Sequence, residues 1–346
     1  MDVALFDYTL PADRIAQRPV EPRDAARLLV DRGDRQPHQN RTVADLAELL
    51  EPGDVLVMND TRVLPARLLL NKGTGGRAEV LLLEPAQGDG RSWHALVRPS
   101  RRLPAGTILY GEQSGTEVPV VEVGPACGSW SGPVRLVELL GTGATSDEQV
   151  MRRWGRVPLP PYIEGDLQDP ERYQTVYADR ADSVAAPTAG LHLTRELIAR
   201  CRRRGISTAF VRLAVGLGTF RPMLAGAVED HTMHRERYRV PAATMDACRR
   251  ARRVIAVGTT TVRALETAAA TGELSGRTGL FIRRPYEFSA VDVLLTNFHL
   301  PRSTLLVMID AFVGPRWRDL YEAALRDGYR FLSFGDAMLL DRGSTR

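Results

Sequence analysis

The sequence predicts a layered α/β domain formed by both ends of the chain, with a small β-barrel-like domain inserted between them. From about residue 141 onward, apolar strands alternate with helices, and this alternation is typical of α/β layers. Between about residues 65 and 140, short apolar runs are separated by glycine and proline, which is typical of a small antiparallel barrel or sandwich. We therefore expect residues 1–64 and 141–346 to form the α/β domain and residues 65–140 to form the insert.

The first expected buried strand is the apolar run 55–58, which ends in the polar loop Asn59-Asp60-Thr61-Arg62. The insert follows this loop. Its expected strands cover residues 78–83, 93–97, 107–110, 118–123 and 134–140. Their spacing of about 8 to 12 residues, with turn residues between them, indicates an antiparallel β module without a helix.

The second half of the chain contains signals for both helices and strands. Ser146 and Gln149 form a capping box that opens a short helix ending at Gly155. Thr194 can cap a helix over residues 195–204. Two strand-to-helix passages are expected after it: a strand over 254–257 leads into a helix over 259–270, and an apolar strand near Val307 leads into a helix around 319–326.

The composition is that of a globular protein, with 346 residues of which 44% are hydrophobic and 25% charged. The net charge of +4 fits a nucleic-acid partner without establishing one. Three separated cysteines with no C-x-x-C pair argue against a disulfide scaffold or a zinc site. No apolar run approaches the roughly 20 residues of a membrane span, and residues 1–7 do not resemble a signal peptide. We therefore expect a cytoplasmic protein without a membrane partner.

Two glycine-containing segments have both a structural and a functional interpretation. Gly141-Thr142-Gly143 lies between a strand and a helix, but it lacks the third glycine and the acidic residue of a dinucleotide site, so we expect an ordinary turn. The segment 216–219 follows a strand over 209–215 and is either a plain turn or a backbone that a ligand approaches closely. Its candidate substrate-binding residues are Gly216, Gly218 and Thr219.

Two further segments could form walls of a binding site. The proline-rich run 157–161 is rigid, and it is either a linker or a wall that presents Tyr162 for stacking on a base. Residues 185–192 combine small side chains, which allow close approach of a ligand, with a histidine that could act as an acid or a base. A structural histidine near a helix start is the alternative. The candidates in this segment are Pro187, Thr188, Gly190 and His192.

Polar residues also gather around three expected strand and helix ends. His231 and His234 lie near an acidic residue, but no third ligand is evident, so we expect no metal site there. Residues 258–263 lie between a strand and a helix, where free backbone N–H groups form a carboxylate or phosphate cradle. The segment 292–306 ends a buried strand in polar residues, and α/β domains place ligands at such ends. The candidates are Thr259, Thr260, Thr261 and Arg263 in the cradle, and Asn297, His299 and Arg302 at the strand end.

Taken together, these segments resemble the S-adenosylmethionine:tRNA ribosyltransferase-isomerase family of queuosine biosynthesis over nearly the whole chain. The matching segments are residues 6–8, 10–11, 15–17, 59–63, 65–67, 158–163, 173–177, 184–192, 215–220, 257–263, 295–306 and 329–338. Such an ordered series is far more specific than any one of these motifs. The fold of the family, an α/β domain that carries an inserted β-barrel, agrees with the fold predicted from the residues.

The resemblance implies that S-adenosylmethionine is a ribosyl donor and co-substrate, and that no further cofactor is needed. The acceptor would be 7-aminomethyl-7-deazaguanine at the wobble position of tRNA, and the products epoxyqueuosine-tRNA, methionine and adenine. The partners would be tRNA and S-adenosylmethionine, and the protein a monomer. This chemistry requires a base for the C5′ hydrogen beside the sulfonium, a proton donor for adenine and a clamp for the carboxylate.

The residues can be assigned to these tasks only as groups. Acid–base work falls to His192, His299, His231 and His234 in an open order, with Asp60 as a further carboxylate candidate. The cradle 259–261 with Arg263 would hold the methionine carboxylate or a phosphate, and Arg62 is a further substrate-binding candidate. Arg156 and Ala214 stand where the family has histidine. This leaves open a paralogue that uses the same chemistry on a small-molecule acceptor, and a non-catalytic RNA-binding relative.

Overall fold

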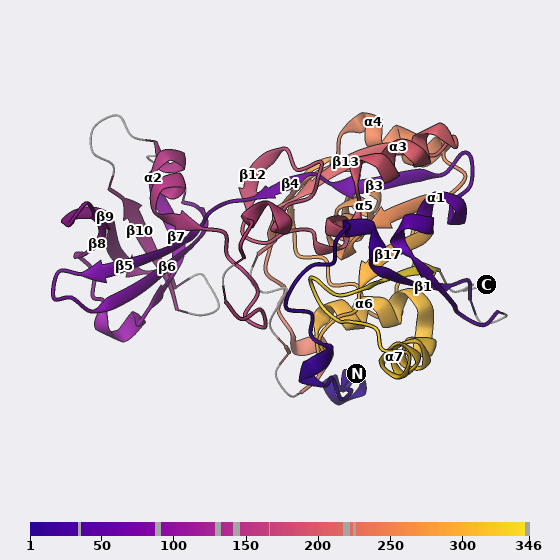
Figure 1. Cartoon of the computed structure of the whole chain (residues 1–346), viewed down its shortest axis with the longest axis horizontal. Coiled ribbons are helices and arrows are strands. Elements are labelled where there is room, and N and C mark those ends of the chain that lie inside the picture. The colour runs from indigo at the N-terminus through magenta and orange to yellow at the C-terminus, as the bar shows by residue number, and fades with distance from the viewer. Residues whose placement is uncertain are drawn as a thin grey trace. The chain divides into compact units, whose positions relative to one another are not determined.

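The computed structural model describes residues 1–33, 36–86, 91–128, 133–140, 146–165, 167–216, 222–223 and 226–342. The chain divides into two compact units (Figure 1). The α/β unit comprises Met1–Arg62, Pro160–Arg180 and Ala186–Arg346, and the barrel unit comprises Val63–Leu159 and Ala181–Ala185. Both ends of the chain therefore belong to the α/β unit.

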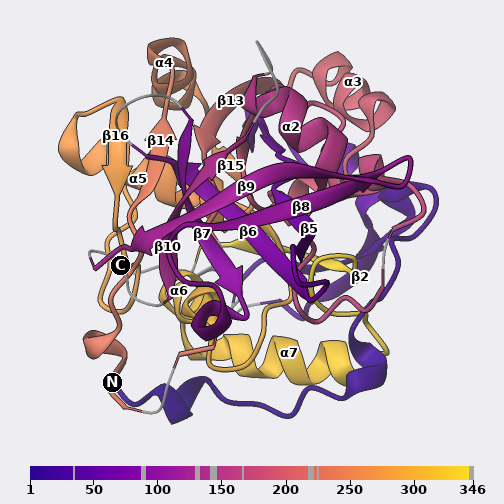
Figure 2. The ribbon, with the colours of Figure 1, turned by 90° about the vertical axis from the view of Figure 1, so that its left-hand side faces the viewer.

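The barrel unit contains a closed antiparallel barrel, and Figure 2 looks onto its strands. The strands follow the order β5-β6-β7-β10-β9-β8, and β5 closes the ring by pairing with β8. They are β5 (Arg67–Lys72), β6 (Arg77–Pro85), β7 (Ser92–Arg98), β8 (Thr107–Gln113), β9 (Thr116–Ala126) and β10 (Val134–Leu139). Alternate side chains point inward, as in β6, where Ala78, Val80 and Leu82 are buried. The β module expected in this part of the chain is confirmed.

Helix α2 (Asp147–Trp154) packs on the barrel. Ser146 and Gln149 form the predicted capping box, each side chain accepting a hydrogen bond from the backbone N–H of the other. Val150 and Met151 of this helix are buried in the barrel core. The strand β11 (Gly155–Arg156) then pairs with β5. Residues 146–159 thus fold with the barrel, whereas the sequence alone placed them in the α/β domain, because the apolar face of α2 has its partner there.

The α/β unit is built on a mixed sheet whose described strands run in the order β16-β14-β13-β3-β15-β17-β18-β1-β2. Its central strands β13, β3, β15 and β17 are parallel. The strands are β1 (Arg27–Asp31), β2 (Gln39–Thr42), β3 (Val55–Asn59), β13 (Ser207–Leu213), β14 (Glu236–Arg239), β15 (Val254–Val257), β16 (Ser275–Thr278), β17 (Val293–Asn297) and β18 (Ala337–Asp341). Two short strands, β4 (Thr61–Val63) and β12 (Arg180–Ser183), pair with each other.

Helices cover both faces of the central strands. Strands β3, β15 and β17 are buried at every position, as expected of parallel strands covered on both sides. Helices α1 (Leu46–Leu49) and α3 (Arg195–Arg203) pack on the face that carries Leu56 and Ile255. Helix α5 (Thr259–Thr271) packs against the same strands, where alternate side chains point the other way. The remaining helices are α4 (Ala242–Arg250), α6 (Thr304–Val313) and α7 (Trp317–Arg326). The predicted fold class is confirmed.

The expected strand near Val307 is wrong, because that residue lies inside helix α6. Ser303 caps α6 by accepting a hydrogen bond from Leu306 N at 3.2 Å. The helix is buried on nearly all sides, and apart from Thr304 and Asp310 its residues are apolar, so it lacks the polar stripe of a surface helix. A short apolar run of this kind does not distinguish a buried helix from a buried strand. The helix expected after it is present as α7.

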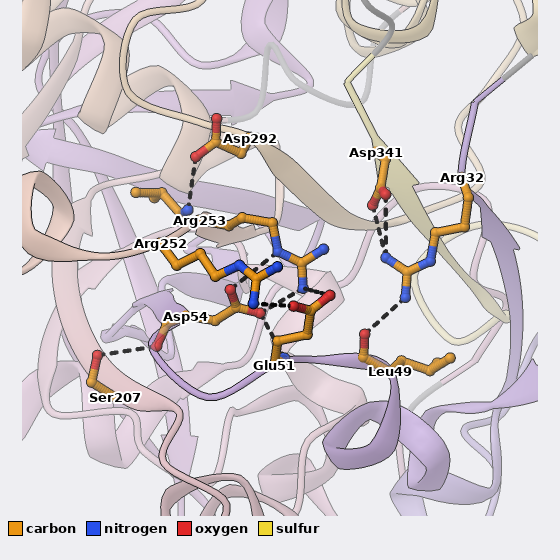
Figure 3. A network of polar contacts seen from close by, with 10 residues as sticks. Arg32, Leu49, Glu51, Asp54, Ser207, Arg252, Arg253, Asp292 and Asp341 are labelled. Atoms are coloured by element: carbon orange, nitrogen blue, oxygen red, sulfur yellow. Dashed lines mark hydrogen bonds and ion pairs between the residues drawn. The ribbon is translucent and has the colours of Figure 1, made fainter.

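Charged residues are paired at the amino ends of the parallel strands (Figure 3). Asp54, which precedes β3, accepts two hydrogen bonds from Arg253, which precedes β15, at 3.1 and 2.7 Å. Glu51 contacts Arg252 at 2.5 Å and its backbone N–H donates to Asp54 at 2.8 Å. Asp292, before β17, accepts from Val254 N at 2.9 Å. This edge of the sheet is held by a network of ion pairs and hydrogen bonds.

Candidate active site

Three pockets of the α/β unit follow one another at the carboxyl ends of the parallel strands. The arginine pocket is lined by Arg263, Glu236, His231, His234, Thr259, Thr260, Met233, Thr304 and Leu305. The histidine pocket is lined by His299, Asn297, Tyr162, Thr188, Ser303, Ser333, Phe298, Leu300, Leu305 and Leu332. Leu305 lines both of these pockets. Ser333 connects the histidine pocket to a third pocket, which His192, Arg23 and Arg172 help to line.

Asn59 ties the carboxyl end of β3 to β13 and to the start of α5. Its Nδ2 donates to the Leu213 carbonyl at 3.0 Å and to Thr260 Oγ1 at 3.2 Å. Its Oδ1 accepts from the backbone N–H groups of Leu213 and Thr61, both at 3.2 Å. The hydroxyl of Thr260 therefore has one of its two lone pairs engaged, and its own hydrogen is available for a ligand.

The strand-to-helix passage on which the cradle was predicted is present as β15 and α5, and the three threonines at the start of α5 differ in their contacts. Thr261 is fully buried and donates its hydroxyl to the Val257 carbonyl at 2.7 Å, so it serves the backbone. Thr259 and Thr260 line the arginine pocket. Gly258 stands at the N-cap with φ of 86°, in the left-handed region that favours glycine, and no side chain caps the helix. The first amide groups of α5 therefore lie at the pocket.

His192 is held by Asn297, and the geometry fixes which of its nitrogens carries the proton. Asn297 Nδ2 contacts the Leu332 carbonyl at 3.2 Å and His192 Nε2 at 2.9 Å. A carbonyl can only accept, so the atom facing Leu332 must be the NH₂ group, and the same group must donate to His192. His192 Nε2 is thus an acceptor. Burial lowers the pKa of His192 to about 4, with a further contribution from Arg330, so the ring is neutral.

His299 is equally buried but has a different partner. Its Nε2 lies 3.1 Å from the hydroxyl of Thr296, and the Tyr8 hydroxyl donates to its backbone carbonyl at 2.5 Å. Burial lowers the pKa of His299 to about 3. A hydroxyl can either donate or accept, so His299 can gain a proton on Nε2 and keep this hydrogen bond. His192 cannot do so, because Asn297 Nδ2 has no lone pair to offer.

The two wall segments predicted from the sequence meet in the histidine pocket. Tyr162 shares a hydrogen bond of 2.7 Å with Ser333, and burial raises its pKa, so its hydroxyl stays protonated. Thr188 begins a 3₁₀ turn that ends at His192, and Pro187 stands at its N-cap. Gly190 lies within the turn, where a Cβ would overlap the Tyr177 hydroxyl. The small side chain at position 190 therefore accommodates Tyr177.

Three candidates are engaged in ion pairs. Both carboxylate oxygens of Asp60 accept from Arg212, at 3.1 and 3.0 Å. Arg62 is about one third exposed and pairs with Glu171. Arg302 has φ of 53° and its side chain, half exposed, lies 3.5 Å from Asp7. Asp60, Arg62 and Arg302 are not among the described residues that line the histidine pocket or the arginine pocket.

His231 and His234 line the arginine pocket, where burial lowers the pKa of His231. Among the described residues no group of three or more His, Cys, Asp or Glu side chains could hold a metal ion. Gly216 donates its N–H to Glu236 at 2.7 Å. Gly218 and Thr219 lie outside the described residues, as do Gly141, Thr142 and Gly143. In the part of the chain that the structure describes, no helix is long and apolar enough to cross a membrane.

Glu236 and Ser333 line the pockets but were not among the candidates. Glu236 alternates with Tyr238 on the buried face of β14. An acidic residue on the inward face of a strand is unusual, and this period-two pattern was the signal that could have identified it. Ser333 follows Leu332, which has φ of 69°. Nothing local in the sequence marks that turn, because it is imposed by contacts with distant segments.

The family described as "Queuosine biosynthesis protein" matches residues 3–340. A relative from Moorella thermoacetica, named S-adenosylmethionine:tRNA ribosyltransferase-isomerase, is 49% identical over 98% of this chain and 100% of its own length. One of the same name from Thermus thermophilus is 49% identical over 97% of this chain and 98% of its own.

A solved structure supports the same relationship. The crystal structure of S-adenosylmethionine tRNA ribosyltransferase from Thermotoga maritima is 36% identical, with a TM-score of 0.54, over 97% of this chain and 99% of that one. The residues 3–340 that the family model matches include every residue that lines the three pockets. The chain therefore belongs to the queuosine biosynthesis protein family.

Proposed function

We propose that this chain is an S-adenosylmethionine:tRNA ribosyltransferase-isomerase. It transfers and isomerises the ribosyl group of S-adenosylmethionine onto 7-aminomethyl-7-deazaguanine at the wobble position of tRNA, and releases adenine and methionine. One observation carries this proposal: relatives of that name match at 49% identity from end to end, so the pocket-forming segments are matched together. The proposed partners are tRNA and S-adenosylmethionine, in the cytoplasm, with a monomeric protein and no additional cofactor.

His299 is the better of the two buried histidines for accepting the C5′ proton. Its hydrogen bond to Thr296 survives protonation, whereas protonation of His192 Nε2 would break the contact with Asn297. His192 then acts as a positioning residue that orients the Asn297 amide. Asp60, engaged with Arg212 through both oxygens, is a weaker candidate for a base.

The low pKa of His299 in the free protein does not prevent this role. Burial disfavours the charged imidazole because the pocket solvates a new charge poorly. When the sulfonium loses its C5′ proton to the imidazole, one positive charge disappears as another forms. The net charge of the pocket is unchanged by the transfer, so bound sulfonium substrate relieves much of the burial penalty.

The direct test is release of adenine and methionine by the purified protein. Both should appear when S-adenosylmethionine is supplied with tRNA that carries 7-aminomethyl-7-deazaguanine, and mass spectrometry should find epoxyqueuosine in the tRNA. The control is the same tRNA with guanine at the wobble position, which should give no release. A chelator should leave the rate unchanged. Release with a small acceptor but never with the modified tRNA would overturn the proposal.

The partnership with tRNA has a separate test. Neutralised phosphates release counterions, so affinity should fall by about 10³- to 10⁵-fold between 50 and 200 mM salt if 6 to 10 phosphates are contacted. Filter binding or anisotropy with the modified tRNA measures this slope. A flat salt dependence would argue against an RNA substrate.

A further inference from the structure

One hydrogen-bond donor of the Arg263 side chain has no acceptor among the residues that the structure describes. The residue is 4% exposed and lines the arginine pocket. Its Nε donates to the Leu280 carbonyl at 3.1 Å and its Nη1 to Glu236. Its Nη2 is buried and has no acceptor among the residues that the structure describes. A buried guanidinium nitrogen without a partner is unfavourable, so an acceptor from a ligand would satisfy it.

Two helices begin at the same pocket. Thr259 and Thr260 are the first residues of α5, and Thr304 is the first residue of α6. No side chain caps α5, so its first amide groups and the Thr260 hydroxyl remain for a ligand. Helix starts carry partial positive charge. Together with Arg263 Nη2 they form a site for an anionic group.

Glu236 adds a negatively charged group to the same pocket. Its carboxylate is 8% exposed, accepts from Gly216 N at 2.7 Å and from Arg263, and lines the pocket. An ionised carboxylate has about four lone-pair sites, so these two bonds leave acceptor capacity. A phosphate carries negative charge on all its terminal oxygens and has no cationic group, so Glu236 would repel it. A ligand with a carboxylate beside an ammonium would satisfy both ends.

Resting on the proposed function, we propose that the arginine pocket binds the zwitterionic α-amino-acid end of S-adenosylmethionine. The carboxylate accepts from Arg263 Nη2 and from the start of α5, and the ammonium donates to Glu236. Glu236 is thus a specificity-determining residue that selects an amino acid over a phosphate. Because Leu305 lines this pocket and the histidine pocket, the sulfonium and ribose extend from one to the other.

A ligand series on the wild-type protein tests this without any mutation. Calorimetry compares S-adenosylmethionine with its decarboxylated form, with a deaminated analogue and with methylthioadenosine, which lacks both groups. Loss of the carboxylate should weaken binding about 10- to 100-fold, and loss of the ammonium about tenfold. L-Methionine should compete with S-adenosylmethionine, and inorganic phosphate should not. Equal affinity for the first two ligands, or competition by phosphate alone, would overturn the proposal.

A variant locates the ammonium contact. Glu236→Gln should bind S-adenosylmethionine and the deaminated analogue within about threefold of each other, while discrimination against the decarboxylated ligand remains. Asp54→Asn is the control, because it removes a buried carboxylate from another arginine pair, at the opposite edge of the sheet, and should keep the wild-type ligand ranking. Unchanged ammonium discrimination in Glu236→Gln would contradict the assignment. If that variant does not fold, the wild-type series still decides.

The outcomes also separate this inference from the proposed function. Binding that ranks the ligands as stated, without turnover on the modified tRNA, would support the pocket and contradict the reaction. Turnover on tRNA without any ranking would support the reaction and contradict the pocket.

Discussion

At the amino ends of β3, β15 and β17 the charged side chains satisfy one another, whereas at the carboxyl ends several buried polar groups keep unused capacity. Asp54 and Arg253 form a two-bonded pair in a wider network at the first edge (Figure 3). At the other edge Arg263 Nη2 and Asn297 Oδ1 are buried without a partner among the described residues. The two edges belong to one sheet, so the difference does not come from fold class.

The difference indicates that the amino edge of the sheet contributes to the stability of the fold, whereas the carboxyl edge contributes to ligand binding. A satisfied buried network stabilises the folded state or holds strand ends in register. Unsatisfied buried groups lower stability, and a native protein retains them where a ligand completes their hydrogen bonds. The carboxyl edge is also where α/β sheets bind ligands. The expected effects of substitutions should therefore differ between the two edges.

The largest expected effect is on stability at the amino edge. Asp54→Asn should lower the free energy of unfolding by about 3 kcal/mol, because it leaves Arg253 without its buried partner. Urea unfolding measures this loss, and turnover at a temperature where the variant is folded should match the wild type. Asp246→Asn, which breaks an exposed pair with Arg249, is the control and should cost less than about 1 kcal/mol. A loss of turnover by folded Asp54→Asn would erase the distinction between the edges.

At the carboxyl edge the expected effect is on chemistry. His299→Ala should lower kcat by about 10²-fold or more, because it removes the proposed proton acceptor. His192→Ala should also lower turnover by about 10²-fold, through loss of the oriented Asn297 amide, and His192→Gln should recover part of it. Single-turnover rates and melting temperatures are measured together. If both alanine variants keep near-normal turnover, the assignment of the histidines is wrong.

The neutral histidines at the carboxyl edge predict a pH dependence of stability. The pKa falls from the ordinary 6.5 to about 4 in folded His192 and about 3 in His299, so the unfolded chain binds more protons in between. Stability is therefore full above pH 6.5 and is lost as pH falls toward these values. Between pH 6.5 and 5 each histidine should account for about 2 kcal/mol. Urea unfolding of His299→Gln should show a shallower dependence; an unchanged slope would contradict neutral burial.

The smallest expected effect is on substrate binding at the cradle. Thr260→Val should raise the KM for S-adenosylmethionine by up to about tenfold with little change in kcat, since a hydroxyl contact to the carboxylate acts in ground and transition states alike. The valine also removes one of the two acceptors of Asn59 Nδ2, so melting is measured in parallel. Thr261→Val is the comparison: its hydroxyl bonds the backbone, so it should lower stability and leave KM unchanged.

Local signals explain most of what could be predicted. The caps at Ser146 and Thr194 and the apolar run 78–83 of β6 are evident from neighbouring residues, and all three elements are present in the structure. The polar ends of β3 and β17 were recognised because parallel strands bring such ends to one edge. The error near Val307 arose where the local signal is ambiguous, since a buried helix and a buried strand are both apolar.

By itself the sequence determined the fold class, the family resemblance and the strand ends at which polar residues gather, because periodicity, caps and ordered motifs are local properties. Only the tertiary structure decided what those residues can do. The tautomer of His192 depends on the Leu332 carbonyl, 35 residues from Asn297. Which nitrogen of Arg263 lacks an acceptor depends on Glu236, 27 residues away. Hydrogen-bond partners and burial are properties of the folded packing, and they set the protonation and unused capacity from which the site's chemistry follows.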